Sequence, residues 1–216
     1  MNIEWLSRQS DRIAELVGWH ILLSLVPLVV GVIVALPIGW LAHRSRRINP
    51  YVVGTAGLLY TIPSLALFVL LPPILGTKIL DPMNIVVALT IYTVALLVRV
   101  IADALDSVPQ ETVLAATAMG YRPYQTLLKV QLPVGVPVIC AGLRVAVVSN
   151  VSLVSLAALL GIPQIGSLFT QGFQLRFYTP IITGIALCLL LALVLDLLIV
   201  LANRLLTPWT PKVVAS

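Results

Sequence analysis

The sequence predicts an all-α integral membrane protein with about five transmembrane helices. Of its 216 residues, 60% are hydrophobic and only 10% are charged, and the mean hydropathy is +1.08. A soluble domain carries roughly 25% charged residues, and a spanning helix needs about 20 mostly apolar residues. We therefore expect five or six spans joined by short connections, with no separate soluble domain between them.

The first span is expected over residues 21–41, which carry no charge and lead directly into the basic segment 43–47. Lys and Arg gather on the cytoplasmic flanks of spans, so this segment is predicted to be cytoplasmic. Residues 1–18 are expected to form a separate N-terminal segment. Their apolar residues recur at near-helical spacing among charges, which fits either a helix lying on the outer leaflet or a frayed terminus.

The second span is expected over residues 49–77. Pro72 and Pro73 should end its helix before an outer loop that holds Lys78 and Asp81, because proline lacks the backbone N–H that a helix interior needs.

The remaining spans are less regular. Residues 84–98 are short for a third span, but a snorkelling Arg99 would let the helix reach about Ala102. Residues 134–160 and 179–202 are the fourth and fifth spans. The whole transmembrane domain is placed at 19–206, followed by a cytoplasmic tail at 207–216.

With five spans, the two ends of the chain lie on opposite sides of the membrane. If the N-terminus is outside and the C-terminus is cytoplasmic, basic residues concentrate inside, as expected. The inner set is Arg44, Arg46, Arg47, Arg99, Arg122, Lys129, Arg204 and Lys212, and the outer set is Arg8, Arg12, Lys78 and Arg176.

A polar insert at residues 103–133 separates the third and fourth spans on the cytoplasmic side. The sequence predicts a helix over about 108–119, begun at Ser107 and stopped at Gly120. Pro123 can open a second helix, which Pro133 is expected to end. Such a bent pair can fit a groove on another protein, and an ordinary amphipathic loop is the alternative.

The insert resembles the EAA signature of the membrane subunits of bacterial ATP-driven (ABC) importers. Ala115 and Ala116 are followed by Gly120, Val130 and Leu132-Pro133 at the family's spacing, and Leu114 stands where the family has Glu. The resemblance implies the type I importer permease fold and a coupling helix that docks on an ATPase. The residues that would carry this role are Leu114, Ala115, Ala116, Met119, Gly120 and Pro133.

Residues 60–76 and 142–169 resemble permeases for glycine betaine, carnitine, choline and related osmoprotectants. This resemblance implies import by alternating access in a bacterial cytoplasmic membrane. The implied partners are two cytoplasmic ATPases, an extracytoplasmic solute-binding protein and a second permease subunit, a homologous one being favoured over an identical one. ATP and magnesium would bind to the ATPases, and this chain would bind no cofactor. An amino acid or another small solute is the alternative cargo.

Polar groups inside two spans are candidates for lining the solute path, because they are costly to expose to lipid. Helix packing through small polar residues is the alternative role. The candidates are Tyr60, Thr61, Ser64, Ser149, Asn150, Ser152 and Ser155.

Arg144 and Asp196 are charges well inside the fourth and fifth spans. An unpaired charge in a membrane is costly, so we predict that they form an ion pair. The glycine-rich stretch 161–178 resembles the outer loop that contributes to the gate of such importers, and a simple exposed hairpin is the alternative.

Several functions are disfavoured by what the sequence lacks. It has no phosphate-binding loop of the Gly-x-x-x-x-Gly-Lys-Ser/Thr type, so it is not expected to hydrolyse ATP. We expect no metal site, no catalysis and no nucleic-acid partner, and the lipid bilayer is the surrounding medium. A passive channel and a scaffold that merely recruits an ATPase remain open alternatives.

Overall fold

The computed structural model describes residues 3–209, which contain helices and no β-strand. In order, these are α1 (Ile3–Arg8), α2 (Ser10–Arg44), α3 (Asn49–Thr61), α4 (Ser64–Leu75), α5 (Pro82–Asp106), α6 (Gln110–Ala118), α7 (Pro123–Thr126), the π-helix η1 (Leu127–Gln131), α8 (Leu132–Leu156), the 3-10 helix η2 (Ala157–Leu160), α9 (Ser167–Gln174) and α10 (Tyr178–Leu206). Four helical stretches are long and apolar enough to cross a membrane, and the bent pair α3–α4 can supply a fifth. The predicted all-α membrane fold is confirmed.

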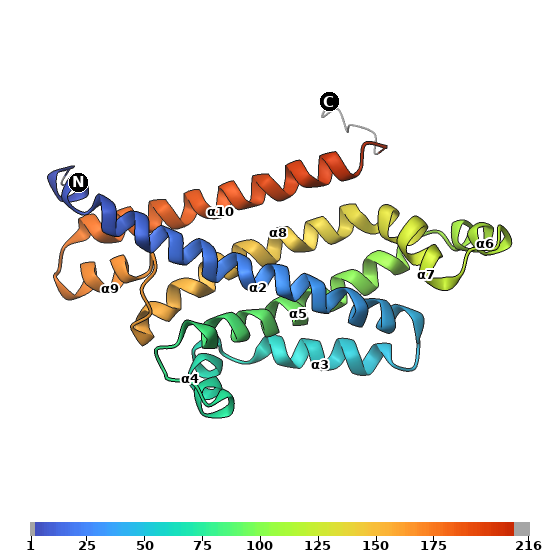
Figure 1. The fold of residues 1–216 in the computed structure, drawn as a ribbon, viewed down its shortest axis with the longest axis horizontal. Coiled ribbons are helices and arrows are strands. Elements are labelled where there is room, and N and C mark those ends of the chain that lie inside the picture. The colour runs from blue at the N-terminus through green and yellow to red at the C-terminus, as the bar shows by residue number, and fades with distance from the viewer. Residues whose placement is uncertain (1–2, 210–216) are drawn as a thin grey trace.

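The long helices run along one axis, and the short elements gather at its two ends (Figure 1). The start of α2, the bent helix α4 and helix α9 lie at one end, which we call the α9 end. Helices α6 and α7 lie at the other end, where α10 also finishes, and we call this the α6 end. The predicted insert therefore projects from one end of the bundle.

Helix α5 is the central element, although its apolar stretch in the sequence is the shortest of the five. In its most apolar window 56% of residues are buried, against 11% in α10. It packs against α2, α3, α4 and α8. The helix is 25 residues long, because it begins at Pro82 and continues past Arg99 to Asp106.

Close approach to α5 depends on glycines of the neighbouring helices. A Cβ atom added to Gly39 of α2 would lie 2.7 Å from Cγ2 of Ile101 and 3.0 Å from the backbone oxygen of Val98. On the other side, a Cβ atom added to Gly142 of α8 would lie 2.5 Å from Cγ1 of Val100. Small residues are the usual means by which membrane helices approach closely.

The second span breaks at Pro63, and the expectation that Pro72 and Pro73 would end it is wrong. Helices α3 and α4 meet at an angle of 101°. Ile62 is extended, with φ −64° and ψ 131°, as a residue before proline prefers. Pro72 and Pro73 lie inside α4, which ends at the left-handed Gly76.

Helix continues through Pro133, contrary to the prediction that this proline ends it. The run from Pro123 to Leu160 is one candidate span of 38 residues, and Pro133 lies in the first turn of α8. A π-helical turn precedes it, in which the N–H of Leu132 donates to the carbonyl of Leu127. We attribute the tolerance of Pro133 to this wider turn, because a proline ring clashes with the carbonyl four residues earlier in a regular helix.

Other boundaries also differ from expectation. Helix α2 begins at Ser10 and continues through residue 18, so no break in helix separates the predicted N-terminal segment from the first span. Ser107 does not cap α6, because its hydroxyl donates to the carbonyl of Ala104 at the end of α5. Residues 210–216 of the predicted tail, including Lys212, lie outside the described residues.

We expect Gly39→Val to destabilise the protein by about 1–3 kcal/mol, the usual cost of overpacking. The matched control is Gly54→Val in α3, because a Cβ atom there meets nothing within 4 Å. Thermal unfolding of the purified variants in mild detergent measures the effect. Equal melting temperatures for the two variants would contradict the close packing of α2 on α5.

Candidate functional site

In the structure α5 continues to Asp106, so the insert predicted at 103–133 is described here as residues 107–130. It contains α6, a sharp turn at Gly120 and the short helix α7. Gly120 has φ +86°, a conformation that favours glycine. Its N–H donates to the carbonyl of Thr117, and the N–H of Tyr121 donates to that of Ala116. Pro123 opens α7, where the N–H of Arg122 donates to the side chain of Gln125. The local sequence therefore fixes the bend.

Exposed apolar side chains occur on the insert, beside exposed polar ones such as Glu111 and Thr117. Leu114 is 58% exposed and Met119 is 71% exposed, and Ala115 and Gly120 are also exposed. Ala116 is buried within the chain itself, and Pro133 is half-buried at the start of α8. An exposed apolar patch outside the spans is typical of a protein-binding surface. Of the six predicted coupling residues, four thus lie on a surface that a partner could contact.

A buried hydrogen-bond cluster at the α9 end was not predicted. His20 of α2 is fully buried, with Nδ1 3.1 Å from Oε1 of Gln164 and Nε2 3.0 Å from the carbonyl oxygen of Val151. Gln164 also donates to the carbonyl of Ser155 and accepts from the N–H of Gly166. The cluster ties α2 and α8 to the loop that precedes α9. No local sequence pattern reveals it, because His20 and Gln164 are 144 residues apart.

Asn150 belongs to the interior of the bundle. Its side chain is 2% exposed, and its amide donates to the carbonyl of Ser24 and to the hydroxyl of Thr93. These bonds join α8 to α2 and α5. A buried amide with such partners stabilises helix packing in this conformation.

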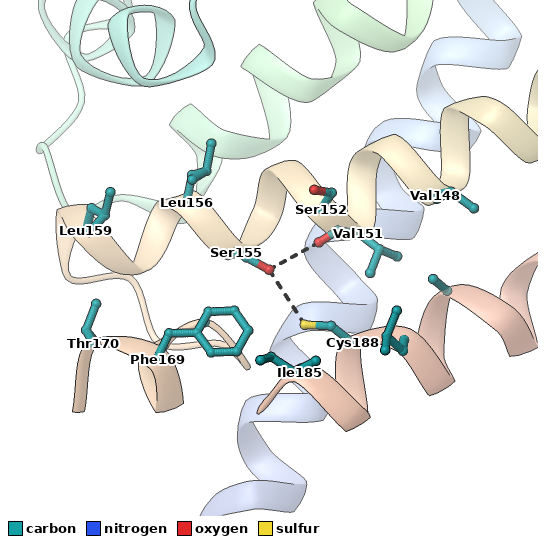
Figure 2. A pocket seen from close by; sticks show the side chains of 13 residues that line it. Val148, Val151, Ser152, Ser155, Leu156, Leu159, Phe169, Thr170, Ile185 and Cys188 are labelled. Carbon is teal, nitrogen blue, oxygen red and sulfur yellow. Dashed lines mark hydrogen bonds between the residues drawn. The ribbon is translucent and has the colours of Figure 1, made fainter. Parts of the chain in front are cut away.

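Ser152 and Ser155 line a cavity between α8, α9 and α10, which has a volume of about 580 Å³. Figure 2 shows Phe169 and Thr170 of α9 opposite α8, and Ser155 turned toward Cys188 of α10. The Ser155 Oγ atom lies 3.6 Å from the Cys188 sulfur. Apart from the hydroxyls and this thiol, the lining is largely apolar.

Tyr60 and Ser149 line a different, much smaller space of about 10 Å³, together with Asn150, Tyr92 and Thr93. The rings of Tyr60 and Tyr92 meet edge to face, with centroids 5.8 Å apart. Thr61 and Ser64 flank the bend between α3 and α4, at the α9 end. Five of the predicted path residues therefore line two separate spaces, and Thr61 and Ser64 line neither of them. The role of all seven in solute passage stays a prediction.

The structure brings Arg144 and Asp196 together in a two-pronged ion pair. Nε of Arg144 is 2.6 Å from Oδ1 of Asp196, and Nη2 is 2.9 Å from Oδ2. The two residues lie one helical turn beyond Val148 and Ala192, which line the large cavity. The pair therefore joins α8 to α10 beside the end of the cavity nearer to α6.

The stretch 161–178 folds into a turn and helix α9. Gly161 is left-handed, with φ +85°, and a Cβ atom on Gly166 would lie 2.3 Å from the carbonyl oxygen of Ser155. Its packing against α8 and α10 differs from a simple exposed hairpin. A role in gating stays a prediction.

No group of three or more His, Cys, Asp or Glu side chains that could hold a metal ion occurs among residues 3–209. Cys140 and Cys188 are both free thiols.

We expect Arg144→Asp to impair folding, because it places two carboxylates side by side at membrane depth. The exchange variant Arg144→Asp/Asp196→Arg restores opposite charges and should recover much of the yield. Size-exclusion chromatography of the detergent-purified variants measures the monodisperse fraction. An exchange variant no better than the single one would contradict a stabilising pair.

Comparison with known proteins agrees with this architecture. The osmoprotectant import permease protein OsmW of Salmonella typhimurium is 33% identical over 215 residues, which cover 97% of each chain. The choline transport system permease protein OpuBB of Bacillus subtilis is 30% identical over 189 residues, 88% of this chain and 86% of that one. A chain of the inward-facing MetNI methionine ABC transporter superposes with a TM-score of 0.76 at 24% identity, and the match covers 98% of this chain and 100% of that one.

The structural likeness confirms the type I ABC importer permease fold. A family model described as the inner membrane component of binding-protein-dependent transport systems matches residues 27–210, which is most of the sequence. This chain belongs to the family of inner membrane components of binding-protein-dependent transport systems.

Proposed function

We propose that this chain is the permease subunit of an ATP-driven importer for quaternary-amine osmoprotectants such as glycine betaine, choline, carnitine or proline betaine. The observation that carries the proposal is family membership combined with an exposed apolar insert at one end of the bundle. Relatives that match most of the chain are named for osmoprotectant, choline and carnitine transport. Their names support the solute class assigned here.

Each proposed partner is assigned to one end of the bundle. Two cytoplasmic ATPases would bind the insert of this chain and that of a second permease subunit, which is homologous or identical. They would hold the ATP and magnesium, and this chain would bind neither. An extracytoplasmic solute-binding protein would deliver the solute at the α9 end.

In the proposed orientation, the α6 end and the C-terminus lie in the cytoplasm and the N-terminus lies outside. Basic residues at the α6 end support this orientation: Arg44 ends α2, Arg46 and Arg47 lie between α2 and α3, and Arg122 and Lys129 lie between α6 and α8. Cytoplasmic connections are enriched in Lys and Arg. The multi-pass chain would reside in a bacterial cytoplasmic membrane.

Alternating access is the proposed mechanism. The ATPases close when they bind ATP, and the insert transmits that motion to α5 and α8, with which it is continuous in sequence. The two subunits would then open toward the outside, and hydrolysis would reset them. Hydroxyl and amide groups of the candidate path residues suit transient contact with a zwitterion or cation, because they replace hydration water without a deep electrostatic trap.

A permease for an amino acid is the second candidate, since the solved methionine transporter shares the fold. At 24% identity that likeness supports the fold alone. A passive channel has no need of an exposed docking insert, so the insert favours the importer over a channel. A scaffold that only recruits an ATPase would bind that partner and show no solute flux.

We expect an ATPase to co-purify with the native chain in mild detergent and to be lost from the variant Leu114→Lys/Met119→Lys. Both side chains are exposed, so the substitutions alter the surface of the insert and leave its packing intact. Mass spectrometry of the purified complex identifies the ATPase and the second permease.

The matched control is Ile79→Lys, an exposed apolar residue at the α9 end. This variant should keep the ATPase. If the ATPase stays bound to the double variant, or if none accompanies the native chain under conditions that preserve the complex, the docking assignment is wrong.

A further inference from the structure

One side chain of α2 holds both ends of the insert. His43 lies in the last turn of α2, and its Nδ1 is 2.5 Å from Oδ1 of Asp106. Its Nε2 is 3.1 Å from Nε2 of Gln131. An imidazole that donates from Nδ1 to a carboxylate keeps a lone pair on Nε2, which can accept from the glutamine amide. Both hydrogen bonds are therefore satisfied by a single tautomer.

The two partners of His43 bracket the insert in the sequence. Asp106 is the last residue of α5, and Gln131 is the last residue of the π-helix before α8. Residues 107–130 lie between them and include α6 and α7. His43 is 63 residues from one partner and 88 from the other. We call His43, Asp106 and Gln131 the His43 clamp.

The clamp is partly shielded from solvent. Gln131 is 7% exposed and the His43 side chain 20% exposed, whereas the Asp106 side chain is 56% exposed. Next to them is a cavity of about 360 Å³ that Thr117 of α6 and Tyr121 also line. The clamp thus lies beside a cavity that residues of the insert also line. A displacement of the insert would therefore change the geometry of these hydrogen bonds.

Besides its packing against α5, helix α2 has in the clamp a direct polar connection to both flanks of the insert. Helices α5 and α8 are continuous with the insert in sequence, whereas α2 is not. π-helical turns are rare and often occur at functional sites, and the clamp holds the last residue of such a turn.

We propose that His43 is a positioning residue for ATP coupling, which ties the first span to the coupling insert so that both move together. This inference rests on the proposed importer function. Loss of the clamp should leave ATP hydrolysis in place while uncoupling it from solute movement. The role is distinct from docking, since none of the three residues belongs to the exposed apolar surface of α6.

The test uses the complete complex in proteoliposomes, with ATP hydrolysis and solute uptake measured in the same vesicles. We expect His43→Leu to lower the uptake per ATP hydrolysed by about tenfold, within the usual range of coupling between sites. His43→Gln should retain most of the native ratio, because its amide can donate to Asp106 and accept from Gln131. If His43 only filled space, the two variants would give the same uptake per ATP hydrolysed.

Two further variants separate the clamp from general stability. Asp103→Asn removes a carboxylate that lies 3.8 Å from Arg99 on the same helix, and it should leave the ratio unchanged. The double variant His43→Leu/Gln131→Leu should be no worse than His43→Leu, because residues acting through one interaction are not additive.

A native uptake-to-hydrolysis ratio in His43→Leu would overturn the clamp while leaving the importer assignment in place. An additive loss in the double variant, or equal loss in His43→Gln and His43→Leu, would also overturn it. If the native complex shows no ATP-dependent uptake at all, the proposed function and the clamp fall together.

Discussion

The arrangement of this molecule depends on how closely α2 and α8 approach the central helix α5. Lipid gives no hydrophobic driving force for helices to associate, so van der Waals packing has to stabilise the contact between them. Small residues at the interface let the two backbones approach closely enough for such packing. Gly39 and Gly142 leave the space that Ile101 and Val100 of α5 occupy on its two sides. Because α5 ends at Asp106, where the insert begins, this packing also sets the position of the insert.

Polar contacts then fix the two ends of the packed helices. At the α9 end His20 and Gln164 join α2, α8 and the loop before α9, and at the α6 end His43 joins α2 to both flanks of the insert. Between them, the Arg144–Asp196 pair connects α10, the least buried of the four long helical stretches, to α8. Buried polar groups are costly unless they are paired, so these contacts favour one arrangement of the helices over nearby alternatives.

Local patterns predicted much of this fold, because span length, charge asymmetry and the glycine turn are properties of neighbouring residues. Helix α6 and the left-handed Gly120 lie where the sequence placed them. Several of the errors came at prolines. Whether Pro63, Pro72 or Pro133 breaks a helix depends on the surrounding turn, as the π-helix before Pro133 shows. The histidine contacts could not be predicted, because each joins residues at least 63 positions apart.

The most direct test of the account is uptake of radiolabelled choline and glycine betaine by the purified complex in proteoliposomes, with a matching solute-binding protein on one side. We predict accumulation that requires both that protein and ATP on the opposite side, and that ADP does not replace ATP. Uptake that proceeds without ATP or without the binding protein would indicate a passive channel and contradict the account. Uptake of methionine in place of both quaternary amines would contradict the solute class alone.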